Sequence, residues 1–149
     1  MASAPREAWG DLATTAFVES SILFKTLDAD ARRDLLQLAQ LVSFAAGELV
    51  SAESDEAFFL VRDGSAAVLV AGPDGPVEIA RLERGALFGE GRVLGTGRPA
   101  ALTALEEVTV VAFPAPVVAA MAERFPKVRK LLEAVSSARE KEAASRLAS

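Results

Sequence analysis

The spacing of apolar side chains divides the chain into a helical start, a long middle of short strands and a helical end. Near the start, DADARRDLLQLAQLV (residues 28–42) repeats apolar residues at helical intervals, with Arg and Asp between them. Asp28 or Asp30 is suited to cap this helix. The predicted apolar stripe consists of Ala31, Leu35, Leu38, Ala39 and Val42.

In the middle of the chain, apolar residues recur at every second position, as in β-strands. AFFLVRDG and SAAVLVAG are β-rich runs joined by Asp63-Gly64, a pair that predicts a hairpin. GPDGP (residues 72–76) predicts another tight turn, and the VEIARL segment after it alternates apolar and polar residues. AALTAL and VTVVAF add two more short strands. About eight short antiparallel strands at this spacing predict a double-stranded β-helix, or jelly roll.

The helical period returns after Pro114. PAPVVAAMAERF places proline near a helix start, where its missing N–H costs nothing. The segment that follows carries one apolar stripe, which either packs on the core or forms a dimer seam. This stripe consists of Val128, Leu131, Leu132, Val135 and Ala138. We therefore predict one α+β, mainly β domain over residues 1–149, with N-terminal helices at 8–41, a β-roll at 42–113 and two C-terminal helices at 115–147.

Composition narrows the possible functions. The 149 residues are 51% hydrophobic and include no Cys, His or Tyr, so thiol and histidine catalysis are excluded and no metal is expected. A metal enzyme on a similar roll normally uses histidines, so we predict that the protein is not an enzyme. The net charge of −5 argues against DNA as a partner. The start lacks the apolar region of a signal peptide, and the longest apolar run, residues 115–122, is too short to cross a membrane. These features predict a cytoplasmic protein without a membrane partner.

Candidate binding residues gather in the glycine-rich stretch GALFGEGRVLGTGRPAALTA, residues 85–104. A phosphodiester ligand needs a cation with several donors, which Arg98 supplies, and close backbone N–H groups, which Gly89 and Gly91 allow. A sugar hydroxyl needs an acceptor, and Glu90 supplies one. In the alternative interpretation, Glu90 and Arg98 form only an exposed salt bridge. We interpret Arg92 as a solvent-facing residue, and the alternative is a second phosphate ligand.

This stretch, in its setting, resembles the cyclic nucleotide-binding domain family, which includes catabolite activator proteins and the regulatory subunit of protein kinase A. The resemblance rests on Phe88-Gly89-Glu90, on Arg98-Pro99-Ala100, and on the order of a helix, a roll with glycine turns, a short helical turn, two strands and two helices. It covers roughly residues 20 to 140.

The resemblance implies a role for each of these positions. Glu90 would accept a hydrogen bond from the ribose 2′-hydroxyl, and Arg98 would pair with the cyclic phosphate. Gly89 and Gly91 would offer backbone donors, and Ala100 would let the segment close on the ligand. The last helix would lie over the base as a lid or pair with a second subunit.

The resemblance also implies a sensor that binds cAMP or cGMP, without a further cofactor, and signals through an unknown effector protein or a homodimer. Pro99 departs from the family pattern because it has no N–H to offer the phosphate, so weak binding is expected. In the alternative, the fold binds no nucleotide and acts as a protein-interaction or dimerisation module. About ten residues follow the last apolar stripe, too few for a helix-turn-helix, so direct DNA reading is not expected.

Overall fold

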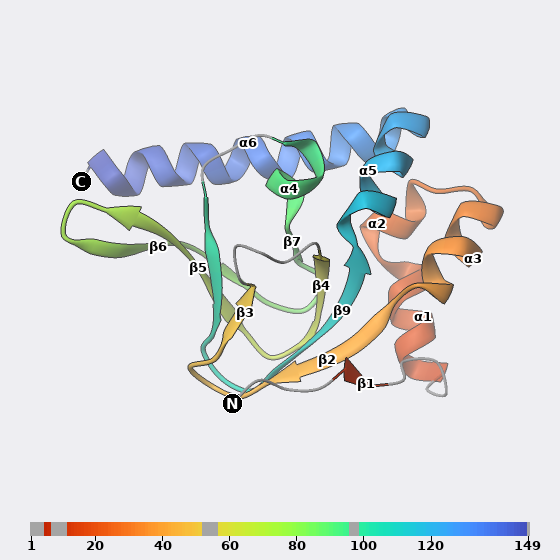
Figure 1. Cartoon of the computed structure of the whole chain (residues 1–149), viewed down its shortest axis with the longest axis horizontal. Coiled ribbons are helices and arrows are strands. Elements are labelled where there is room, and N and C mark those ends of the chain that lie inside the picture. Colours follow the sequence, from red (N-terminus) through yellow and green to blue (C-terminus); the bar gives the residue numbers. More distant parts are fainter. Residues whose placement is uncertain (1–4, 7–11, 52–56, 96–98, 149) are drawn as a thin grey trace.

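The computed structural model of the chain describes residues 5–6, 12–51, 57–95 and 99–148 (Figure 1). The helices are α1 (Leu12–Ser20), α2 (Ile22–Lys25), α3 (Ala29–Gln37), α4 (Glu90–Leu94), α5 (Ala115–Arg124) and α6 (Pro126–Ala148). The strands are β1 (Pro5–Arg6), β2 (Gln40–Phe44), β3 (Leu49–Ser51), β4 (Ala57–Asp63), β5 (Ala66–Gly72), β6 (Gly75–Leu82), β7 (Leu87–Phe88), β8 (Ala101–Ala104) and β9 (Val108–Pro114).

Two antiparallel sheets form the β-roll and enclose its apolar core. Their strand orders are β1-β2-β9-β4-β7 and β3-β8-β5-β6. Val61 and Val110 of the first sheet and Val68 and Leu102 of the second belong to this core and are fully buried. Within the described residues, the eight strands β2 to β9 make the roll and the two-residue β1 extends one sheet edge. The predicted fold class is therefore confirmed.

A second apolar core joins the helices to the outer face of β4 and β9. Figure 1 shows α1, α2, α3 and α5 together at one end of the roll, whereas α6 continues across it. The ring of Phe24 from α2 lies 5.9 Å from that of Phe113 in β9, and Leu35, Val118 and Leu132 are fully buried in the same cluster. Each such side chain contributes about 1.5–3 kcal/mol on burial, so the helices are an integral part of the fold.

The predicted hairpin at Asp63-Gly64 is wrong. Strand β4 pairs with β7 and β9, whereas β5 pairs with β6 and β8 in the other sheet. The chain therefore turns a corner at Gly64 and changes sheet. Gly64 has φ +85°, and a Cβ there would lie 2.2 Å from the carbonyl oxygen of Glu107. The Asp-Gly pair indicates a backbone that needs glycine, and this requirement does not determine which strands pair.

The other predicted tight turn is confirmed. Gly72 of β5 and Gly75 of β6 are register partners, so Pro73 and Asp74 form a two-residue connection. The hairpin carries Val70 and Ile79, both buried in the roll core, and it provides one wall of the pocket described below.

Both predicted helical stripes extend too far. Helix α3 is capped by Asp28, whose carboxylate accepts from the Ala31 N–H at 2.8 Å, but it ends at Gln37. Leu38 is 46% exposed, and Val42 lies in β2, because pairing of β2 with β9 begins at Gln40. In α6, Val128 and Leu132 are buried as predicted, whereas Ala138 is exposed.

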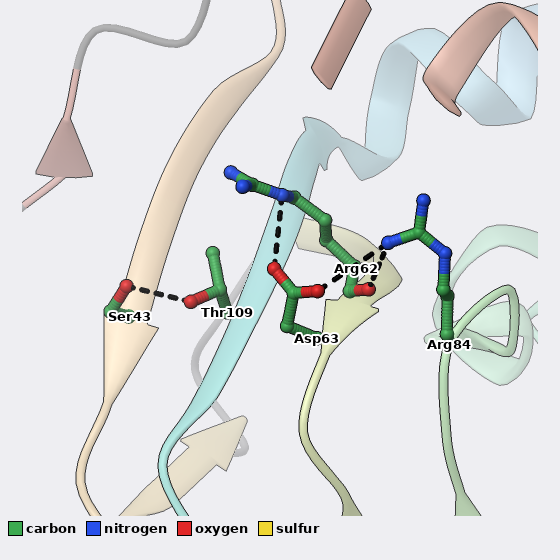
Figure 2. Close-up of polar contacts among 5 residues, drawn as sticks. All are labelled: Ser43, Arg62, Asp63, Arg84 and Thr109. Atoms are coloured by element: carbon green, nitrogen blue, oxygen red, sulfur yellow. Dashed lines mark hydrogen bonds and ion pairs between the residues drawn. The ribbon is translucent and has the colours of Figure 1, made fainter. Parts of the chain in front are cut away.

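The start of the glycine-rich stretch is fixed to the end of β4 (Figure 2). Arg84 donates to the Arg62 carbonyl at 2.9 Å and lies 3.4 Å from the Asp63 carboxylate, and its guanidinium stacks on Phe17 of α1 at 4.2 Å. The next residue, Gly85, donates its N–H to the Val61 carbonyl at 2.9 Å. These contacts hold the backbone that leads into β7 and α4. Figure 2 also shows the 3.0 Å hydrogen bond between Ser43 and Thr109, which joins β2 to β9.

Replacement of Gly64 tests the corner between the sheets. We expect Gly64→Ala to lower the free energy of unfolding by about 3 kcal/mol or more, because a left-handed backbone conformation and a backbone clash act together. Gly47→Ala is the matched control, since Gly47 has φ +88° but nothing within 4 Å of its added Cβ. We expect Gly47→Ala to lower the free energy of unfolding by about 1–2 kcal/mol. Urea unfolding measures both, and equal losses would contradict this account of the corner.

Candidate functional site

A pocket of about 340 Å³ lies between the β-roll and α6. The hairpin of β5 and β6 contributes an aliphatic wall of Val68, Val70 and Ile79. The β7–α4 segment and the residues before β8 form a second wall. Helix α6 forms a third wall with Ser136, Arg139 and Glu140. Both sheets and the last helix therefore meet at one site.

The structure brings six of the seven predicted site residues together. The residues that line the pocket are Phe88, Gly89, Glu90, Gly91, Pro99 and Ala100. Arg98, the predicted phosphate ligand, lies outside the described residues. The described part of the predicted site is thus contiguous in space.

Gly89 determines how the segment enters α4. Its φ of +109° is a left-handed conformation that favours glycine. A Cβ at Gly89 would lie 3.0 Å from the Ala57 carbonyl oxygen and 3.2 Å from the Phe58 Cα, both in β4. Glycine at this position lets the backbone lie directly against β4 and brings Glu90, the first residue of α4, to the pocket.

Glu90 is buried and paired with a residue that the sequence analysis did not identify. Its Oε1 accepts from Nη1 of Arg139 at 2.5 Å, and the two side chains are only 10% and 14% exposed. Nη2 of Arg139 donates to the Leu87 carbonyl at 2.5 Å, and the guanidinium lies 5.6 Å from the Phe88 ring centroid. The interpretation of Glu90 as one half of an exposed salt bridge is therefore wrong.

The spacing of the buried residues in α6 indicates that Arg139 lies on the same face of the helix. Val128 and Leu132 are four residues apart on the buried face, and Arg139 comes one heptad after Leu132. A helix repeats its orientation about every seven residues, so Arg139 continues the buried stripe. A charged residue on an apolar stripe needs a partner of opposite charge, and the buried carboxylate of Glu90 is that partner.

Arg92 is also placed differently from the prediction. It lies in α4, lines the pocket and is half-buried, and its Nη1 atom is inaccessible to solvent. The solvent-facing interpretation is wrong for this guanidinium, because α4 lies against α6 and the side chain is partly covered. The pocket therefore contains a second guanidinium besides that of Arg139.

The chemistry of the described pocket residues suits a ligand with one flat apolar part and one hydroxylated part. Aliphatic side chains of Val68, Val70 and Ile79 can contact the face of a ring. Glu90 has a second carboxylate oxygen, Oε2, besides the one that binds Arg139, and this oxygen can accept a hydrogen bond from a hydroxyl.

Among the described residues, no three His, Cys, Asp or Glu side chains are grouped as a metal site. No helix in the described ranges has the length and apolar character needed to cross a membrane.

A double-mutant cycle measures how strongly α6 is held to the pocket. We expect Glu90→Gln and Arg139→Gln to show a coupling energy of about 1–3 kcal/mol in the free energy of unfolding, because removing either partner leaves a charge in a poorly solvated site.

The matched control is the exposed pair of Glu133 and Arg129 on the same helix, 3.3 Å apart and more than half exposed. For Glu133→Gln and Arg129→Gln, we expect a coupling energy of about 0.5 kcal/mol or less in the free energy of unfolding. A Glu90–Arg139 coupling no larger than that of the control would show that the buried pair does not hold the helix.

Comparison with known proteins is consistent with this geometry. A sequence profile described as "Cyclic nucleotide-binding domain" matches residues 41–125. No curated protein matches the chain. Among solved structures, the regulatory subunit of a cAMP-independent protein kinase A from Trypanosoma brucei superposes with a TM-score of 0.71 at 17% identity, over 87% of this chain and 49% of that one.

Two further structures share the fold. The regulatory domain of Toxoplasma gondii protein kinase A, solved with cAMP, gives a TM-score of 0.68 at 22% identity, over 83% of this chain and 48% of that one. The sensor domain of the transcriptional regulator DNR from Pseudomonas aeruginosa gives a TM-score of 0.69 at 19% identity, over 84% of this chain and 91% of that one. This chain thus spans about half the length of the two kinase regulatory chains. Because the profile match covers more than half of the 149 residues, from β2 to the end of α5, the chain belongs to the cyclic nucleotide-binding domain family.

Proposed function

We propose that the pocket binds a cyclic mononucleotide, cAMP or cGMP, and that the protein is a sensor and not an enzyme. The observation that carries the proposal is the buried carboxylate of Glu90, which lies in a pocket with an aliphatic wall on one side and a helix over it. The family membership and the fold support it. Two of the neighbouring structures are regulatory chains of a kinase, and one of these was solved with cAMP.

Each part of a cyclic nucleotide has a counterpart in this proposal. The purine lies against Val68, Val70 and Ile79, and the ribose 2′-hydroxyl donates to Glu90. The cyclic phosphate pairs with Arg98, whose planar guanidinium can give two parallel hydrogen bonds to a phosphate. Such charge-assisted contacts contribute roughly 1.5–3 kcal/mol each.

Pro99 weakens the phosphate side of this arrangement. It lines the pocket but has no N–H, so one phosphate oxygen lacks a backbone donor. A buried acceptor without a donor costs roughly 1–3 kcal/mol, which corresponds to about ten- to a hundredfold in affinity. We therefore propose that binding is weak for the family.

The output of binding passes through α6. This helix is anchored in the helical core by Val128 and Leu132 and closes the pocket with Arg139. A ligand that interacts differently with two positions of α6 shifts the population between them. We propose that an effector protein or a second copy of the chain detects this shift. Because the net charge is −5, we propose that duplex DNA is not the partner. We also propose that the protein acts in the cytoplasm.

Calorimetric titration with cAMP, cGMP and a cyclic dinucleotide tests the proposal. We expect a cyclic mononucleotide to bind and Pro99→Ala to tighten binding by about ten- to a hundredfold, because the substitution restores a backbone donor. Glu90→Gln should weaken binding less than Arg98→Ala does, since an amide oxygen still accepts from a hydroxyl. Arg98→Ala should abolish binding while the unfolding transition stays unchanged.

Arg33→Ala is the control for the loss of a positive charge, because Arg33 pairs with Asp30 on the exposed face of α3, where both side chains are more than 60% exposed. The Arg33→Ala protein should bind the cyclic mononucleotide with the same affinity as the wild-type protein. If no nucleotide binds wild type at millimolar concentration and Pro99→Ala does not restore binding, the sensor proposal fails. The β-roll is then a protein-interaction or dimerisation module.

A further inference from the structure

Positive charge is concentrated where α5 ends and α6 begins. The segment ERFPKVRK, residues 123–130, carries four cations and one acid in a chain whose net charge is −5. The four cations, all of them exposed, are Arg124, Lys127, Arg129 and Lys130. The proposed nucleotide site uses none of these side chains.

The backbone makes this segment one continuous corner. The N–H of Phe125 donates to the Met121 carbonyl at 2.7 Å, and the N–H of Val128 donates to the Phe125 carbonyl at 3.0 Å. Val128 is fully buried in the helical core, so the first turn of α6 has a fixed orientation. Lys127 and Lys130 are three residues apart and lie together on the solvent side of this turn.

The two lysines lack the acidic partners that other exposed cations have. The exposed arginines that pair with an acid of the same chain are Arg33, Arg81, Arg84, Arg129 and Arg146. Within the described ranges, Lys127 and Lys130 have no ion-pair partner. The residues four positions farther along α6 are Leu131 and Ala134, and Glu133 is already paired.

The local electrostatics of α6 also disfavour these cations. The first turn of a helix carries a partial positive charge, so cations there are unfavourable. The first turn of α6 contains no acidic residue. Arg124 stacks on the Phe125 ring at 5.0 Å, which leaves its positive charge exposed beside the lysines. A charge pattern that opposes local stability is expected where a protein binds a partner.

We propose that Arg124, Lys127 and Lys130 form a docking surface for an acidic segment of a partner protein. Charge complementarity is the reason for this choice of partner. A membrane surface also requires apolar side chains that insert, whereas Val128 and Phe125 pack against the helical core. A nucleic acid would be repelled by the net charge of −5.

This docking surface lies on the helix that lines the pocket, but apart from the pocket. Figure 1 shows α5 beside the first turns of α6, at the opposite end of that helix from the β5–β6 hairpin. Lys130 precedes Ser136, the first α6 residue of the pocket, by six residues, or about 9 Å along the helix axis. A partner can therefore contact α6 without touching the ligand. The identification of this partner with the effector rests on the proposed function, whereas the docking surface itself does not.

A labelled poly-glutamate peptide tests the docking surface in nucleotide-free protein at low salt. We expect Arg124→Gln/Lys127→Gln/Lys130→Gln to bind the peptide at least about tenfold more weakly than wild type, because three exposed ion pairs are lost. Its urea unfolding midpoint should equal or exceed that of wild type, so that weaker binding does not reflect unfolding. Its affinity for cAMP and cGMP should equal that of wild type. If the peptide does not bind wild type at millimolar concentration, the docking surface is refuted while the proposed nucleotide site stands.

The matched control removes the same charge from cations that are paired. Arg33→Gln/Arg81→Gln/Arg146→Gln replaces three exposed arginines that have acidic partners in the chain, and it should bind the peptide within about twofold of wild type. Equal losses in the two triple variants would show that only net charge matters and would overturn the proposal. A single-stranded oligonucleotide and vesicles of phosphatidylcholine and phosphatidylserine in equal parts are titrated in parallel. If either binds through the same three cations as tightly as the peptide does, the assignment to an acidic protein is wrong.

Discussion

The ion pair between Glu90 and Arg139 is the interaction on which the site depends. It joins the first residue of α4 to the middle of α6, with both side chains nearly enclosed by protein. Charges in such a place are stable only with a partner, because their lost hydration is not restored by the surrounding apolar groups. The pair therefore orients Glu90 in the pocket and is one of the contacts that hold α6 over it. The second hydrogen bond of Arg139, to the Leu87 carbonyl, extends the attachment to β7.

In the proposed sensor, this pair makes ligand recognition and helix position parts of one equilibrium. In our proposal, a sugar hydroxyl that binds Glu90 approaches a carboxylate that already holds α6. The ligand can therefore alter the strength of the attachment without touching the helical core, in which Val128 and Leu132 fix the other part of α6. Linkage requires the effect to be reciprocal, so a partner that favours one position of α6 also changes the affinity for the ligand. The size of this coupling is limited by the difference between the ligand's affinities for the two positions of α6.

Local sequence signals predicted the features that depend on local backbone geometry. The Gly-Pro-Asp-Gly turn identified the β5–β6 hairpin, and Phe88-Gly89-Glu90 identified a segment whose glycine must lie against β4. The pairing errors came from interactions between distant parts of the chain. Asp63-Gly64 indicated a tight turn, but pairing of β4 with β9 decided which sheet each strand joined. Arg139 was missed because its partner is 49 residues away, and a motif search within one stretch does not connect them.

In our proposal, the charges of the pocket give Arg98 a larger role than one hydrogen bond. Among the described lining residues, the two cations Arg92 and Arg139 balance the two anions Glu90 and Glu140. This balance leaves the described pocket without net attraction for an anion. Arg98 would add one positive charge, which matches the single negative charge of a cyclic phosphate. Such a match acts over the whole pocket, because a Coulomb interaction is stronger at every distance when the effective dielectric constant is lower than that of water. The loss of a backbone donor at Pro99 therefore weakens one contact, whereas the loss of Arg98 would remove the electrostatic reason for an anion to enter.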